Sequence, residues 1–213
     1  EVAPAAPRQG PMTITADGLR HVYRGGTVAL EGRDVTRQLA KGLGSRIAHV
    51  PEDRHERGMV DEYTLADNMV LNQYRQPPFA RWSIIRRQEV RRHAERLMEE
   101  YDVRASSPDT RAGTLSGGNQ QRLLLSFLPA NPVLLLLENP TRGLDIESVN
   151  WVWQNLHRYC HNRTSIVFSS SELDEILMVA DRILVFYNGR IIADVDAADT
   201  DVPQLGRAIA GRI

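Results

Sequence analysis

The segment LSGGNQQ at residues 115–121 contains residue types that can bind a phosphate group. Its serine and two glycines precede RLLLSFL, a run with helical character, so they would occupy the first turn of a helix. The first N–H groups of a helix have no partner within it, and the helix dipole places partial positive charge at the same end. Such an end can bind phosphate. Taken alone, Ser-Gly-Gly is equally typical of a turn and helix cap.

A second candidate group lies in VLLLLENPTRGLD at residues 133–145. Its apolar run ends at Glu138, and ligands of open α/β proteins bind at the carboxyl ends of parallel strands. Glu138 would therefore present a carboxylate at a ligand-binding edge, although an ordinary acid at a strand end is the alternative. The following turn would carry Asp145 onto a loop. A further loop, SSSELDE at residues 169–175, also follows an apolar run.

Three short apolar runs, at residues 133–137, 165–168 and 183–187, must position these loops. Helical stretches separate them, and runs that are apolar on both faces indicate strands covered by helices on both sides, hence a parallel sheet. The last run also precedes NGRI, which predicts a final hairpin. Ahead of these runs the pattern predicts a strand at 46–50 and then a largely helical block. This block contains a helix at 64–74 and a long amphipathic helix at about 83–101.

The N-terminal part is predicted to be extended. Residues 1–11 contain three prolines and are typical of a linker or terminal arm. Alternating apolar residues predict a strand at 12–22, and residues 27–32 predict a hairpin strand and its turn. The expected fold is an α/β core that carries a helical insertion.

Composition narrows the class of protein. The chain has 213 residues, of which 42% are hydrophobic, and 26 basic residues oppose 27 acidic ones, so no basic field favours nucleic acid. A lone cysteine, Cys160, excludes a disulfide framework. We expect no membrane span or secretory leader and an intracellular location. The arginines of the 83–101 helix alternate with glutamates and predict a solvated face.

Taken together, the motifs resemble the nucleotide-binding domain of ABC transporters. LSGGNQQ resembles the family signature, LLLLEN its Walker B strand, RGLD its D-loop and SSSELDE its switch loop. IAHVPEDRHERG at residues 47–58 is similar to a Q-loop region in which Glu52 replaces the usual glutamine. The combination resembles the second domain of duplicated nucleoside and simple-sugar importer ATPases, with a lean towards the nucleoside type.

The resemblance implies a P-loop NTPase-type parallel sheet, an N-terminal antiparallel β portion, and a helical subdomain at about 62–128 that carries the signature, all within residues 12–213. It implies ATP and Mg²⁺ as cofactors, with Glu138 as the metal ligand. It also implies a head-to-tail pair with a second nucleotide-binding domain, permease subunits that bind near residues 74–82, and a peripheral place at the cytoplasmic face of the membrane. The implied nucleotide contacts are Tyr23, Glu52, Ser116, Gly117, Gly118, Asn119 and Gln120, with Asp145 at the dimer interface.

The chain departs from this family at the P-loop, the segment that binds the nucleotide phosphates. A P-loop needs a glycine-rich turn followed by Lys and Ser or Thr, and no such motif occurs, since the only lysine is Lys41 in AKGLGS. Residues 11–23 resemble the first strand of the domain and residues 25–36 resemble the strand after the P-loop. We therefore expect that a segment is missing near residues 23–25. The alternative is that the chain is continuous at this point and has lost its P-loop.

The second departure concerns hydrolysis. By resemblance Asn139 occupies the position of the usual catalytic glutamate and Ser171 that of the switch histidine. An amide cannot accept a proton from the attacking water, so hydrolysis at this chain's own site should be reduced or absent. Two functions remain open: a working importer ATPase domain, and a silent domain that lends its signature to a partner's ATP site. A soluble ABC protein of DNA repair or translation is a third, less favoured interpretation.

Overall fold

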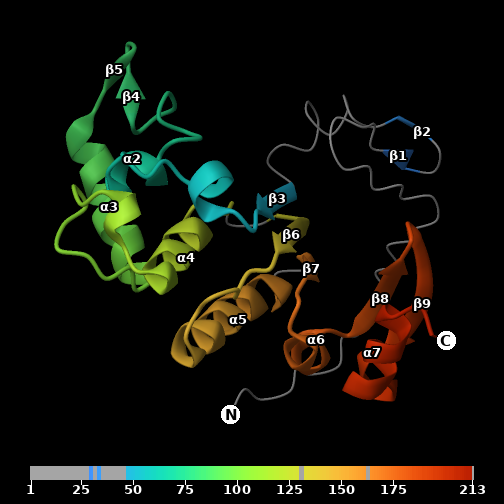
Figure 1. The fold of residues 1–213 in the computed structure, drawn as a ribbon. Helices are drawn as coiled ribbons and strands as arrows, with labels where there is room; N and C mark the ends of the chain where they lie inside the picture. Colours follow the sequence, from blue (N-terminus) through green and yellow to red (C-terminus); the bar gives the residue numbers. More distant parts are fainter. Residues whose placement is uncertain (1–28, 31–32, 35–46, 130–131, 162–163, 213) are drawn as a thin grey trace.

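The structure is a computed structural model that describes residues 29–30, 33–34, 47–129, 132–161 and 164–212 (Figure 1). Its central feature is a parallel sheet in the order β3 (Ile47–Val50), β6 (Leu134–Glu138) and β7 (Ser165–Ser169). The predicted strands at 46–50, 133–137 and 165–168 are thereby confirmed. Because the three strands are parallel, their carboxyl ends meet at one edge, which gathers the loops that follow them.

Helix α5 (Ile146–His161) connects β6 to β7 and packs on the sheet. Val152, Trp153 and Leu156 on its inner face are buried in one cluster with Leu135 of β6. The Trp153 ring meets Phe168 edge to face, with ring centroids 4.8 Å apart. Trp153 thus packs α5 against β7, and the loop at residues 139–145 leads from β6 into this helix.

The helical block lies between β3 and β6 in the chain. It comprises the π-helical turn η1 (Arg54–Gly58), α2 (Leu65–Met69), α3 (Arg87–Glu100), the 3-10 turn η2 (Ala112–Thr114) and α4 (Gly117–Ser126). Val90, Ala94 and Leu97 line the buried face of α3 at helical spacing. On the opposite face Arg91 bonds Glu95 and Arg96 bonds Glu100, so the predicted solvated face is confirmed.

Two helix boundaries differ from the prediction. The helix expected at 64–74 ends at Met69, because successive turns with i to i+3 hydrogen bonds continue the chain through Gln76. The helix expected at 83–101 begins only at Arg87. Residues before it form a hairpin of β4 (Ala80–Arg81) and β5 (Ile84–Ile85). Ile84 and Ile85 are adjacent β-branched residues, and such residues favour a strand. The prediction used only their spacing, which also fits a helix.

The C-terminal part has its own small core. Helix α6 (Leu173–Val179), the antiparallel pair β8 (Arg182–Tyr187) and β9 (Arg190–Asp196), the turn η3 (Ala197–Asp199) and α7 (Val202–Ile209) follow β7. The predicted final hairpin is confirmed. The expectation that residues 183–187 form a strand of the parallel sheet covered on both sides is wrong. This strand, β8, pairs antiparallel with β9, only Ile183 and Val185 point into the small core, and the alternate residues are exposed.

Near the N-terminus, β1 (Ala29–Leu30) pairs antiparallel with β2 (Arg33–Asp34), which confirms the predicted hairpin there. The linker at 1–11 and the strand at 12–22 lie outside the described residues. The fold is thus a mixed α/β fold with a parallel core, antiparallel pairs and a helical insertion. None of the helices in the described part of the chain has both the length and the apolar character needed to cross a bilayer.

Candidate functional site

Glu138 ends β6 at the carboxyl edge of the sheet, as predicted. Its Oε1 lies 3.2 Å from His49 Nε2 of the neighbouring strand, and its Oε2 accepts a 3.4 Å hydrogen bond from the Glu52 backbone N–H. The side chain stays 45% exposed. This arrangement keeps the carboxylate at the surface, where it can bind a cation or a hydrated ion.

Asn139 follows directly and adopts a left-handed conformation with φ of 43°. Asparagine is among the few non-glycine residues that tolerate this region. Its N–H donates to the Ser169 carbonyl at 2.8 Å, and its side-chain Oδ1 accepts from the Ser171 N–H at 3.1 Å. The two positions that resemblance assigned to catalysis are therefore in direct contact. The amide of Asn139 holds the backbone of the loop that contains Ser171.

Glu52 and Arg54 connect the β3 end to two other segments. Glu52 forms an ion pair with Arg142 in the loop after β6. Arg54 donates to the Gly117 carbonyl at 3.1 Å and to the Arg142 carbonyl at 3.0 Å. Partial burial lowers the pKa of the Arg54 guanidinium from its ordinary value. Arg54 thus joins the start of α4 to the loop after β6, a connection that the sequence did not indicate.

The signature segment starts α4, as predicted, with Ser116 at its N-cap position. The Ser116 hydroxyl makes no capping bond to the helix and accepts instead from Asn119 Nδ2 at 3.1 Å. Asn119 Oδ1 accepts from the Arg104 N–H at 2.8 Å, while Gln120 is buried. Gly118 faces α5, since a Cβ there would lie 2.5 Å from Ser148 Oγ. Ser116 and the helix N-terminus remain accessible, whereas Asn119 and Gln120 are held by their own chain.

Asp145 caps α5. Its Oδ1 accepts from the Ser148 N–H at 2.9 Å and its Oδ2 from the Ser148 hydroxyl at 3.0 Å. These bonds hold the pKa of the Asp145 carboxyl below its ordinary value, and the bond from the Ser148 backbone N–H has the larger effect. The residue is exposed and lies beside Gly118. Helix capping alone therefore explains why an aspartate occupies position 145.

Sequence reasoning missed Glu175, in the first turn of α6. This buried carboxylate accepts from the Thr141 hydroxyl at 2.5 Å, Trp153 Nε1 at 2.7 Å and the Ser170 hydroxyl at 2.7 Å. It thereby joins the loop after β6, the loop after β7 and α5. An acid three residues after Glu172 in SSSELDE was visible, but nothing in the sequence indicated its partners.

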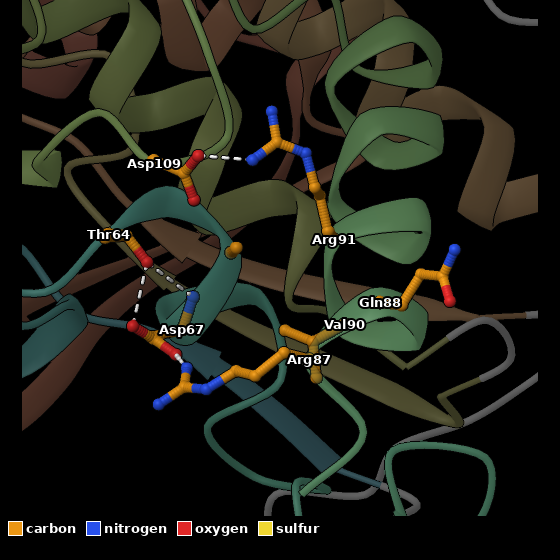
Figure 2. A pocket seen from close by; sticks show the side chains of 8 residues that line it. Thr64, Asp67, Arg87, Gln88, Val90, Arg91 and Asp109 are labelled. Carbon is orange, nitrogen blue, oxygen red and sulfur yellow. Dashed lines mark hydrogen bonds and ion pairs between the residues drawn. The ribbon is translucent and has the colours of Figure 1, made fainter.

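A cavity of about 470 Å³ lies between α2 and α3, away from these residues (Figure 2). Its charged side chains are paired with one another: Arg87 Nη1 donates to Asp67 at 2.6 Å, and Arg91 bonds Asp109. None of the candidate residues lines it. Tyr23, Lys41 and the join at residues 23–25 lie outside the described residues.

A parallel sheet with an acidic residue at its carboxyl edge and a helix that starts with glycines are consistent with a fold of the P-loop NTPase type. The fold matches the solved dimeric structure of an ATP-binding cassette in a post-hydrolysis state bound to ADP and phosphate. The TM-score is 0.62 at 19% identity over 81% of this chain and 73% of the other. A sequence profile described as ABC transporter matches residues 15–142. The chain belongs to the ABC transporter family.

Curated relatives are importer components. The chain is 37% identical to a nucleoside import ATP-binding protein of Lactococcus lactis over 87% of its own length. It is 34% identical over 95% of its length to a guanosine import ATP-binding protein of Bacillus subtilis, and 36% identical over 84% to a ribose import ATP-binding protein of Burkholderia thailandensis. It spans only 37%, 40% and 34% of the length of these three proteins, in that order.

Proposed function

We propose that this chain is an ATP-binding domain of an importer for nucleosides or simple sugars, in which ATP binding and hydrolysis drive transport. The names of the relatives, which include nucleoside, guanosine and ribose import proteins, support the substrate class. The observation that carries the proposal is the meeting of three loops at one sheet edge. Glu138, Asn139 and Ser171 lie there, and Arg54 ties the signature helix to the same edge.

Magnesium would be held by Glu138, directly or through water. The residues fit such an ion, because Mg²⁺ in nucleotide sites is usually held by one or two carboxylates, phosphate oxygens and water. Glu138 supplies one carboxylate, which is 45% exposed. The bound ion would offset the charge of the nucleotide phosphates.

The domain would work as half of a head-to-tail pair at the cytoplasmic face of the membrane, with permease subunits bound near residues 74–82. Ser116 and the N–H groups of Gly117 and Gly118 would contact a nucleotide held by the partner domain. The exposure of Ser116 and its unused capping capacity support this role. Asn119 and Gln120 would act by shaping the helix start, and Asp145 would lie at the interface. Glu52 would sense nucleotide, and Tyr23 would stack on adenine.

The domain would occupy residues 12–213, with a helical subdomain at about 62–128 after a linker at 1–11 and with a P-loop segment missing near residues 23–25. The intact mass of the natural protein, with peptides mapped across residues 23–25, tests this arrangement. Additional peptides between residues 23 and 25 would support a P-loop in this chain. A continuous peptide across these residues would leave this chain only the signature role.

Hydrolysis at this chain's own site would be weak, because Asn139 cannot act as a general base and its side-chain oxygen is already bonded to the Ser171 N–H. This contact favours the silent alternative, in which the chain mainly completes a partner's site. The test is Asn139→Glu in the complete importer, with ATP turnover as the readout. We expect turnover to rise at least tenfold, since general-base catalysis contributes typically 10²–10⁴-fold.

The control for this test is Asn139→Gly, which keeps the left-handed backbone but supplies no base. It should leave turnover low. Equal turnover in both variants and the wild type would show that Asn139 does not limit hydrolysis.

A further inference from the structure

Arg54 lies between two segments that come from distant parts of the chain. It begins η1, the turn that follows β3. Its Nη1 donates to the Gly117 carbonyl, 63 residues away at the start of α4, and its Nη2 to the Arg142 carbonyl, 88 residues away in the loop after β6. The donors of a guanidinium form a rigid planar fork. The two bonds therefore set the spacing between the signature helix and the loop after β6.

Neutralising an acid does not explain this arginine. None of the ion pairs among the described residues involves Arg54. Partial burial lowers the pKa of its guanidinium, so keeping the charge here costs free energy. The guanidinium also lies beside the N-terminus of α4, where the helix dipole disfavours a cation. The two carbonyls that it holds are the best explanation for its place.

The turn that carries Arg54 is itself fixed in place. The Asp53 side chain caps the turn and accepts hydrogen bonds from two of its backbone N–H groups, both at 3.0 Å. At the other end of the turn Gly58 packs on α4, since a Cβ there would lie 2.8 Å from Leu124 Cδ2. The Arg54 side chain therefore starts from a backbone that is already located on the signature helix.

The loop after β6 is well located at the point where Arg54 meets it. Glu52 forms an ion pair with the Arg142 side chain, and the Arg142 N–H donates to the Asn139 carbonyl at 3.1 Å. This loop begins directly after Glu138, at the carboxyl edge of the sheet. A residue that binds the Arg142 carbonyl is thus positioned relative to the edge where the nucleotide would lie.

We propose that Arg54 is a positioning residue that holds Ser116 and the first N–H groups of α4 at a set distance from the carboxyl edge of the sheet, ready to contact a partner domain's nucleotide. This inference rests on the proposed role of the signature segment, and it adds the residue that sets the position of that segment. Arg54 would not touch the nucleotide itself. It would act through Ser116, which distinguishes it from a residue that only stabilises the fold.

The first test measures ATP turnover of the complete importer. Arg54→Gln should lower kcat about tenfold, the size expected for the loss of a hydrogen bond to a charged group. Arg54→Lys keeps the charge, but an ammonium group lacks the planar fork, so it should regain no more than about threefold of this loss. Arg57 is exposed in the same turn and provides the matched control. Arg57→Gln should leave turnover unchanged.

The second test asks whether Arg54 acts through Ser116. We expect Ser116→Ala alone to lower turnover about tenfold, as the loss of one hydrogen bond to the nucleotide would. In the Ser116→Ala background, Arg54→Gln should then lower turnover by less than about threefold, because effects of residues that act as one unit do not add. A general loss of fold would instead lower turnover by the same factor in both backgrounds.

Hydrogen exchange of the nucleotide-free importer gives a readout that does not depend on turnover. The N–H groups of Gln120 and Leu144 are hydrogen-bonded within their own segments, at 2.9 Å and 3.1 Å. Arg54→Gln should speed exchange about tenfold both at the start of α4 and in residues 139–144, because it releases the two segments together. Arg57→Gln should change neither segment, and exchange in β6 should stay the same in both variants.

Four results would overturn the proposal: equal turnover in the Arg54→Gln and Arg57→Gln variants, full recovery in Arg54→Lys, equal loss in both Ser116 backgrounds, or unchanged exchange in the two segments. If Ser116→Ala lowered turnover while any of these results held, the proposed function would stand and only the role of Arg54 would be wrong. If Ser116→Ala left turnover unchanged, the proposed role of the signature segment would be wrong as well.

Discussion

Asp145 receives both of its hydrogen bonds from Ser148, and they lower the pKa of its carboxyl below the ordinary value of 3.8. A lowered folded-state pKa means that the contribution of Asp145 to stability is fully present above the ordinary value and is lost as pH falls through the folded value. Asp145→Asn keeps an acceptor but cannot titrate. The difference in urea midpoint between wild type and variant should therefore be constant from pH 7 to 5 and shrink below about pH 4. A constant difference down to pH 2.5 would contradict this.

Glu175 is the buried acceptor for three donors, from Thr141, Trp153 and Ser170. Glu175→Ala would leave these groups without an acceptor, and the free energy of unfolding should fall by about 3 kcal/mol. Glu175→Gln retains an acceptor oxygen and should cost about half as much. Asp174, one position earlier and exposed, provides the control, and Asp174→Ala should cost less than about 1 kcal/mol. Urea unfolding at pH 7 measures all three, and equal losses in the Glu175→Ala and Asp174→Ala variants would rule out the network.

At the scale of elements, α4 meets α5 through a glycine. A Cβ at Gly118 would lie 2.5 Å from Ser148 Oγ and 3.3 Å from Ser148 Cβ. Gly118→Ala should therefore destabilise the protein by about 1–3 kcal/mol, and by less in a Ser148→Ala background. Gly206 lies within α7 with nothing within 4 Å of its Cβ position, so Gly206→Ala should stabilise by about 0.4–1 kcal/mol. Thermal unfolding of the Gly118→Ala and Gly206→Ala variants measures both effects. If both substitutions changed the stability in the same direction, this expectation would be wrong.

Elements whose signal is local were predictable from the sequence. The continuous apolar runs at β6 and β7 lie in a parallel sheet, as their lack of polar alternation indicated. The hairpin at Ala80–Ile85 was not predictable, because Ile84 and Ile85 satisfy a helical period and a strand equally well. The choice depended on a turn formed by Trp82 and Ser83, whose residue types disfavour it.

The candidate site was only partly predictable for a similar reason. Glu138 and Asn139 follow a recognisable strand, so their place at the sheet edge could be inferred. Arg54 bonds Arg142, which is 88 residues away, and Glu175 accepts from Trp153, which is 22 residues away. Contacts at such separations depend on how helices pack, which the order of residues does not display.

At the scale of the whole molecule, the described residues form two apolar clusters of unequal size. The larger joins the sheet, α5 and the helical block, and the smaller consists of Ile183, Val185, Leu205 and Ala208 with neighbours from α6 and β9. The hydrogen bonds of Glu175 tie α6 to the larger cluster. Among the described residues, the side-chain hydrogen bonds of β8, β9 and α7 stay within the C-terminal part. Because local opening starts where few apolar groups are buried, the boundary should lie between α6 and β8.

Hydrogen exchange checks this division. In the wild type, amides of β8 should exchange faster than those of β6, because opening the small cluster exposes little apolar surface. Leu205→Ala should speed exchange in β8, β9 and α7 only, whereas Leu135→Ala, at a fully buried position, should lower protection in β6 and the rest of the larger cluster by about 2–5 kcal/mol. If Leu205→Ala lowered protection in β6 as much as in β8, the two clusters would open as one unit. The pattern in Leu135→Ala further tests whether the smaller cluster can stay folded without the larger one.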